Sequence, residues 1–180
     1  MTRLSSVLTA LDLPLAELCA ARLDGELYAL DEAFAPIDSP EGPTERARSV
    51  AAYCHGRLIA EQSTAAWIWG ARATPPRYHE LCASLGARAR PVFPLRTLVR
   101  EVVIDESEFA IIGGVPVTTP LRTIVDLVRT RETFGDEDAA VIGRLLSIGR
   151  TTVANCLTAL ESRQNLPNKR RARVRLSTLD

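Results

Sequence analysis

The residues best suited to chemistry are basic ones near the C-terminus, in the sequence NKRRARVRL at positions 168 to 176. Arginines at this density can donate charge-assisted hydrogen bonds to phosphate groups and release counterions from nucleic acid. We therefore predict that six basic residues contact DNA: Arg163, Lys169, Arg170, Arg171, Arg173 and Arg175. Two alternatives stay open: a solvated tail, and a helix that pairs with acidic residues 24–45 of the same or of a second subunit.

Charge is distributed unevenly along a chain whose formal net charge is zero. Residues 1–45 hold nine acidic residues against two arginines, a balance of −7. Residues 161–180 hold six basic residues against two acidic ones, a balance of +4. This asymmetry predicts that the two ends of the chain have different partners.

Familiar catalytic patterns are absent from the sequence. The glycines form neither a P-loop nor a G-x-G-x-x-G fingerprint, and G-x-S-x-G does not occur. A restriction-type nuclease needs a lysine beside paired carboxylates, but Lys169 is the only lysine and has no acidic neighbour. Asp105, Glu106 and Glu108 could hold a metal ion, although a solvated hairpin tip is the simpler interpretation. We predict a protein without enzymatic activity, metal or cofactor.

The cysteines and histidines also lack the spacing of a metal site. No two of the four cysteines form a C-x-x-C pair, and we expect them to be small buried hydrophobic residues. His55 and His79 have no partner at ligand spacing. The chain contains no run of eighteen apolar residues, and acidic residues interrupt any signal-peptide pattern near the N-terminus. These features predict a cytoplasmic protein.

Two segments about fifty residues apart carry the most specific pattern. The first reads AEQSTAAWIWG from residue 60 to 70, and it predicts a short helix with Ser63 as its N-cap and Gly70 just past its end. We expect Trp67 to lie in the core. Trp69, two positions further on, should be partly exposed, which leaves room for a contact with a partner.

The second segment reads GGVPVTTPLRTIVDL from residue 113 to 127. It predicts a glycine turn, a short strand at 115–118, and a helix with Thr119 as N-cap and Pro120 in its first position. Arg122 and Asp126 are four residues apart in that helix. We therefore expect a local ion pair, which on an exposed face is worth about 0.3–0.5 kcal/mol.

Together these segments resemble the AbiEi antitoxins of type IV toxin–antitoxin systems, in their actinobacterial branch. The residues that carry the resemblance are Ser63, Ala65, Ala66, Trp67, Trp69, Gly70, Gly114, Pro116, Val117, Thr118, Pro120, Arg122, Thr123, Asp126 and Leu127. It implies a protein that counteracts a separate nucleotidyltransferase-type toxin and represses its own operon through an N-terminal winged helix. The alternative is a stand-alone DNA-binding transcriptional regulator without a toxin partner.

The wider pattern predicts an α+β fold, with a small central mixed sheet, helices at both ends, and a truncated winged-helix-like unit in front. That unit covers residues 1–38, a linker follows at 39–43, and the main domain spans 44–180. Helices are expected at 13–22, 44–55, 120–131, 137–147, 151–163 and 168–179, and strands at 58–60, 78–84, 97–104 and 115–118. A helix-turn-helix at 137–162 is a further alternative for reading DNA.

Overall fold

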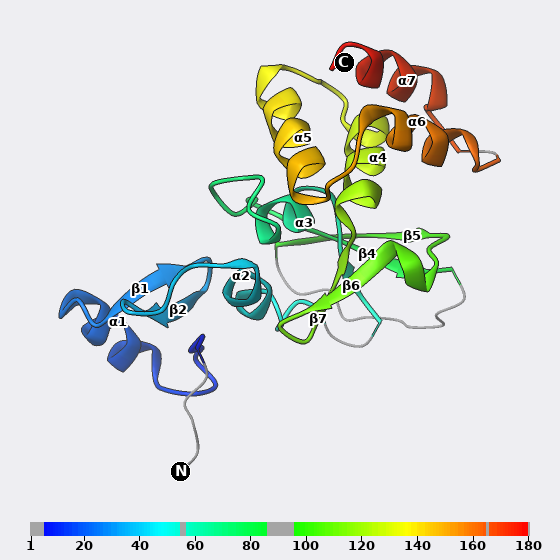
Figure 1. Ribbon diagram of the computed structural model, residues 1–180. Coiled ribbons are helices and arrows are strands. Elements are labelled where there is room, and N and C mark those ends of the chain that lie inside the picture. The colour runs from blue at the N-terminus through cyan, green and yellow to red at the C-terminus, as the bar shows by residue number, and fades with distance from the viewer. Residues whose placement is uncertain (1–5, 55–56, 86–95, 165, 180) are drawn as a thin grey trace.

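The computed structural model describes residues 6–54, 57–85, 96–164 and 166–179. The N-terminal part forms a small projecting unit, drawn in blue in Figure 1. It consists of helix α1 (Leu15–Leu23) and a hairpin of β1 (Leu27–Leu30) and β2 (Ala33–Pro36). Leu8 adds an antiparallel bridge to Phe34, on the edge of β2 opposite β1. Helix α1 confirms the helix expected at 13–22.

The central sheet is mixed, and across the described ranges its strand order is β5-β4-β3-β7-β6. The strands are β3 (Ile59–Ala60), β4 (His79–Ser84), β5 (Thr97–Val102), β6 (Phe109–Ile112) and β7 (Val115–Thr118). β3 lies antiparallel to β4 and parallel to β7, and β4 lies parallel to β5. The four predicted strands are confirmed. β6 was not predicted; it forms a hairpin with β7 across Gly113 and Gly114, whose φ angles are +56° and +90°.

Helix α4 (Pro120–Thr130) lies at the centre of a group of helices, as Figure 1 shows. Helix α4 contacts α3 (Gln62–Ile68), α5 (Asp136–Ile148), α6 (Val153–Glu161) and α7 (Lys169–Ser177). It takes this central place because every residue from Arg122 to Arg129 is buried. The predicted α+β architecture is confirmed.

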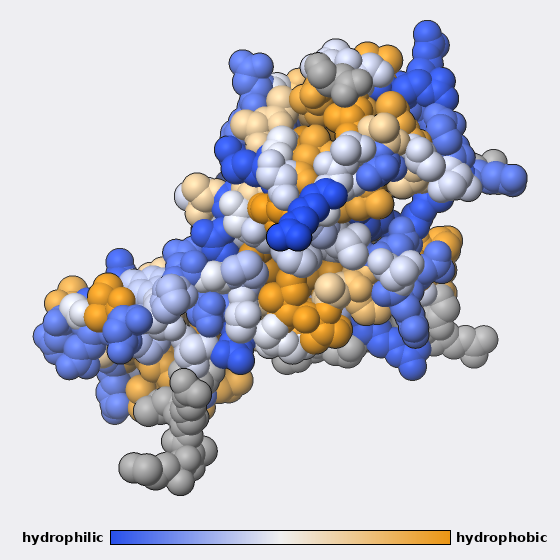
Figure 2. Space-filling model, viewed as in Figure 1, coloured by the Kyte–Doolittle hydropathy of each residue, from blue (hydrophilic) through white to orange (hydrophobic). Residues whose placement is uncertain are grey.

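Buried apolar residues form separate clusters on the two sides of α3. One cluster contains Trp67 together with Leu30 and Ala33 of the N-terminal hairpin, so this hairpin shares a core with the sheet. The other cluster joins α4 to α5, α6 and α7. Figure 2 shows the N-terminal unit as a lobe with orange groups on a largely blue surface. Its exposed apolar residues include Leu11, Leu15, Leu23 and Ile37.

Several local predictions were wrong. Ser63 is not an N-cap, because α3 begins two residues earlier than predicted, at Gln62, and Glu61 stands at its N-cap. The helix expected at 44–55 is α2 (Pro43–Ser49), which is shorter and begins after Gly42; His55 lies outside the described residues. The acidic cluster is no hairpin tip, because β5 and β6 lie at opposite edges of the sheet.

Other local expectations are settled as well. Cys19 is exposed, whereas Cys82 and Cys156 are buried as expected. The predicted helix-turn-helix region is α5 and α6, and α6 turns Val153, Cys156 and Leu160 into the core. In the described ranges, no helix is both long enough and apolar enough to cross a membrane.

Candidate functional site

Asp126 lies at the centre of a buried network of charged side chains. It projects from the inner face of α4 and is 0% exposed. Arg122 Nε donates to its Oδ2 at 2.8 Å, Arg129 Nη1 donates to Oδ1 at 2.9 Å, and Arg100 Nη2 from β5 lies 2.9 Å from Oδ2. A buried carboxylate is costly unless it is paired and hydrogen-bonded, so these arginines make its position possible. The predicted pair of Arg122 and Asp126 is confirmed, but the exposed face expected for it is wrong.

Other carboxylates hold the same arginines from different elements. Glu61, which is 1% exposed, accepts hydrogen bonds from Nε and Nη2 of Arg100 at 2.5 and 2.7 Å. Glu108 ends the 3-10 helix η1 (Glu106–Glu108) and accepts from Arg122 Nη1 at 3.0 Å and from Arg163. The network therefore ties β5, η1, α4 and the end of α6 together.

The pKa values in this network follow from burial and pairing. Burial lowers the pKa of Arg100, but the hydrogen bonds with Glu61 and the charge of Asp126 outweigh it, so that pKa is raised. The pKa of Arg129 is lowered, mainly by burial. The charge of Asp126 opposes this shift, and repulsion from Arg100 and Arg122 adds to it. Because guanidinium groups keep their charge at ordinary pH, the network is suited to holding structure rather than to transferring protons.

The two sequence segments meet directly. Trp69 Nε1 donates to the carbonyl oxygen of Thr118 at 2.8 Å, and the hydroxyl groups of Thr118 and Thr123 lie 2.8 Å apart. Thr119 caps α4 by accepting from Arg122 N at 3.3 Å, as predicted. The partly exposed Trp69 therefore links the end of β7 to α3.

The other residues of the two segments have structural positions. Trp67 is 1% exposed, which confirms its place in the core. Gly70 follows α3 with a φ of +86°, the left-handed conformation expected just past a helix end. Pro116 lies within β7, Gly114 lies in the turn before it, and Pro120 occupies the first turn of α4.

Ser63 has a different role from the one predicted. Its backbone N–H donates to Oε2 of Glu80 at 2.8 Å, so a carboxylate from β4 caps α3 from outside the helix. Its hydroxyl group accepts from Arg131, which also pairs with Glu80 at 3.4 Å. The sequence reasoning missed Glu80, Glu61 and Arg100, because they come from separate elements and share no spacing along the chain.

Five of the six predicted DNA-binding residues lie on α7 and Arg163 follows α6, but most of them already have partners in the fold. Arg175 donates to the carbonyl oxygens of Val128 and Arg131 at 3.0 and 2.8 Å, and Arg171 donates to that of Arg129 at 2.7 Å. These arginines therefore supply hydrogen bonds to backbone carbonyl oxygens that have no partner within the last turn of α4.

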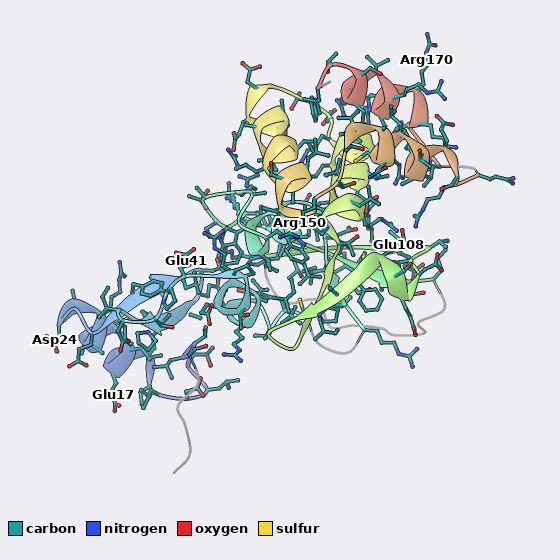
Figure 3. The ribbon with its side chains drawn as sticks, in the orientation of Figure 1. Glu17, Asp24, Glu41, Glu108, Arg150 and Arg170 are labelled. Carbon is teal, nitrogen blue, oxygen red and sulfur yellow. The ribbon has the colours of Figure 1, made fainter. Side chains whose placement is uncertain are left out.

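The remaining basic residues differ in their partners. Arg173 and Lys169 pair with Glu161, and Arg163 pairs with Glu108. Among the residues that the structure describes, Arg170 has no such partner, and Figure 3 shows it pointing away from the molecule. Helix α7 packs on α4 and α6, far from acidic residues 24–45, so the pairing proposed within one chain is wrong.

A second polar cluster fixes the N-terminal hairpin to the main sheet. Asp31, at a φ of +54° in the hairpin turn, lies 2.8 Å from Nε2 of the buried His79 through its Oδ2. Arg96 donates to Asp31 at 3.3 Å and to Glu32 at 2.5 Å, and Tyr53 donates to Glu32. The ring of Tyr53 lies 4.8 Å from that of His79. We call this cluster the hairpin joint.

The acidic residues considered for a metal ion have other contacts. Asp105 caps η1 in a capping box with Glu108, and Glu108 is bound to arginines. Within the described ranges, no three His, Cys, Asp or Glu side chains gather as metal ligands would.

Comparison with known proteins shows to which family this chain belongs. No curated protein matches the chain. The crystal structure of the RV2827C protein from Mycobacterium tuberculosis has a similar fold, with a TM-score of 0.51 and 16% sequence identity, over 97% of this chain and 71% of that one. The model of the AbiEi antitoxin C-terminal domain matches residues 52–177, which include the whole Asp126 network. The chain therefore belongs to the AbiEi antitoxin C-terminal domain family.

Proposed function

We propose that this protein is a non-catalytic antitoxin that counteracts a nucleotidyltransferase-type toxin. The family match over residues 52–177 carries the proposal. The pairing of two buried acids, Glu61 and Asp126, and of the half-buried Glu108 supports it. Glu61, Glu108 and Asp126 are each held by arginines, so a reaction that used these carboxylates would have to break ion pairs inside the fold.

The test is neutralisation in a living host. We expect a gene for a nucleotidyltransferase beside the gene for this chain. That enzyme, expressed alone, should arrest growth, and co-expression of this chain should restore growth. An Arg150→Gln variant, altered at an exposed arginine in the turn between α5 and α6, should protect equally well. Growth arrest that persists beside well-expressed antitoxin would contradict the proposal.

We further propose that α7 contacts DNA and lets the protein regulate its own operon. The side of α7 that α4 does not cover carries Arg170 and Arg173, and Arg173 keeps 60% of its side chain exposed. The N-terminal unit does not support this contact, because it is acidic. Glu17, Asp24 and Glu41 lie at the opposite end of the molecule from Arg170 (Figure 3).

The DNA proposal is tested by the salt dependence of binding to the promoter region. Each phosphate neutralised contributes about 0.9 to the slope of log affinity against log salt. Changing Arg170 and Arg173 together to Gln should lower that slope by roughly two. Changing Arg57 and Arg150 to Gln removes the same charge elsewhere and should leave the slope unchanged. Equal slopes in both variants would contradict a contact through α7. DNA binding without any neutralisation would favour the alternative, a stand-alone regulator.

A further inference from the structure

A pocket of about 530 Å³ lies between the end of β5, α4 and the connection from α6 to α7. Guanidinium groups reach it from these different elements: Arg100, Arg122, Arg129 and Arg163. Apolar side chains, among them Val102, Val103 and Leu166, form much of the remaining wall. Pockets for small molecules typically measure about 300–1,000 Å³ and combine apolar walls with a few converging polar groups. This pocket has both features.

The carboxylates that pair with these arginines do not balance their charge. Among the described residues, the partners of the four guanidinium groups are Glu61, Glu108 and Asp126, which leaves one positive charge in excess. Glu101 and Asp105 also line the pocket, but both are exposed, and the Asp105 side chain caps η1. When these two carboxylates are counted as well, the lining has no positive excess, so the case for an anionic ligand depends on the unused donors of the arginines.

The arginines also keep hydrogen-bond donors that no described residue uses. Arg129, which is 4% exposed, donates from Nη1 to Asp126 and from Nε to the Pro167 carbonyl oxygen, and its Nη2 has no acceptor within the described residues. Nη1 of Arg100 and Nη2 of Arg122 also have no hydrogen-bond acceptor within the described residues. Burial and the charges of Arg100 and Arg122 lower the pKa of Arg129, and a bound anion would relieve that repulsion.

We propose that this pocket binds a small organic phosphate. The phosphate group accepts hydrogen bonds from the spare amino groups of the arginines, and the apolar part of the molecule packs against Val102, Val103 and Leu166. A phosphate fits better than a carboxylate because its oxygens can accept from guanidinium groups that approach from several directions. This binding is independent of toxin neutralisation and of DNA contact.

The test uses variants of Val103, which is 67% exposed in the pocket wall, so that the buried network stays intact. Arg122 Nη1 donates to the Val103 carbonyl oxygen at 3.3 Å, so Val103→Glu puts a negative charge next to this guanidinium, where it competes with the phosphate; Val103→Gln is the matched neutral control. Thermal unfolding and calorimetry are measured with AMP, inorganic phosphate, adenosine and sodium chloride at equal ionic strength. AMP should raise the melting temperature in a saturable way, and adenosine should not.

The outcomes separate the possibilities. Val103→Glu should weaken AMP binding by roughly tenfold or more, whereas Val103→Gln should not. Stabilisation by AMP and phosphate no greater than that by sodium chloride would overturn the proposal, as would equal AMP affinity in the two variants. If inorganic phosphate binds as tightly as AMP, the proposed contact between an organic group and the apolar wall is wrong. In a second variant, Arg163→Gln, AMP affinity should also fall; Arg150→Gln is its control outside the pocket.

Discussion

Arg100 Nη2 lies 2.9 Å from Oδ2 of Asp126, so a guanidinium from the edge strand β5 is bound to the buried face of α4. This pair connects the sheet to the helices, because Arg100 also binds Glu61 in front of α3. The family match includes all of these positions. We regard this junction as the structural centre of the domain.

The first prediction concerns Asp126. Asp126→Asn keeps the shape of the side chain but removes the charge that Arg100, Arg122 and Arg129 share. Removing one partner of a buried ion pair typically costs about 3–5 kcal/mol, because it leaves the other charges buried without compensation. We expect a loss of that size in urea unfolding followed by circular dichroism.

The control for this prediction is Glu137→Gln. Glu137 is 81% exposed and 3.8 Å from Arg72, so its loss should change the free energy of unfolding by less than about 0.5 kcal/mol. Equal stability of the Asp126→Asn and Glu137→Gln proteins would show that the network contributes nothing to the fold.

The second prediction concerns Trp69. Trp69→Phe keeps most of the aromatic ring but removes the hydrogen bond to the Thr118 carbonyl oxygen. We expect a loss of about 0.5–1.5 kcal/mol from the hydrogen bond alone, measured by urea unfolding with Trp67 as the fluorescent probe. Tyr78→Phe, at a residue that is 45% exposed, should have almost no effect. A Trp69→Phe protein as stable as the Tyr78→Phe protein would contradict the link.

The third prediction separates two arginines of α7. Arg175 donates to carbonyl oxygens at the end of α4, and its guanidinium lies 5.0 Å from the centre of the Phe134 ring. Arg175→Met should therefore lower stability by about 1–2 kcal/mol. Arg170→Met, on the outer side of the same helix, should change it by less than about 0.5 kcal/mol. Thermal unfolding of the two variants checks this, and the reverse order would mean that α7 is not docked as described.

The fourth prediction concerns the pH dependence of the hairpin joint. Burial raises the pKa of Asp31, but the hydrogen bonds and charges of His79 and Arg96 outweigh burial and hold that pKa below its ordinary value. A carboxyl group whose pKa is lower in the folded state adds stability above its unfolded pKa of about 3.9. That stability is lost as the pH falls through the folded pKa.

Asp31→Asn tests this dependence, because Asn tolerates the positive φ at this position. The difference in free energy of unfolding between the two proteins should be constant above about pH 5 and should shrink below about pH 4. Glu32, Tyr53, His79 and Arg96, the other groups of the hairpin joint, are the same in both proteins. Asp24→Asn, at an exposed position on the same unit, is the control. A difference that does not change between pH 5 and pH 3 would contradict the role of Asp31.

Much of the local structure could be predicted from the sequence because its signals are local. Thr119 and Pro120 specify the start of α4, and Gly70 specifies the end of α3, because caps and first-turn residues act within a few positions. Trp67 belongs in the core for its size alone. The start of α3 was misplaced because its cap is Glu80, seventeen residues away from Ser63 in the chain.

The sequence by itself determined the helices, most strands, the uneven charge and the family resemblance, since each of these depends on neighbouring residues or on composition. Only the tertiary structure decided which charges meet. Arg122 and Asp126 suggested a weak surface pair, but α4 is enclosed by other helices, and burial turned the pair into part of a network with Arg100 and Glu61. Likewise, the basic C-terminal run predicted a helix that contacts DNA and left open a solvated tail. In the folded chain this run docks on α4 instead, because Arg171 and Arg175 donate hydrogen bonds to carbonyl groups at the end of that helix. These groups come together only on folding.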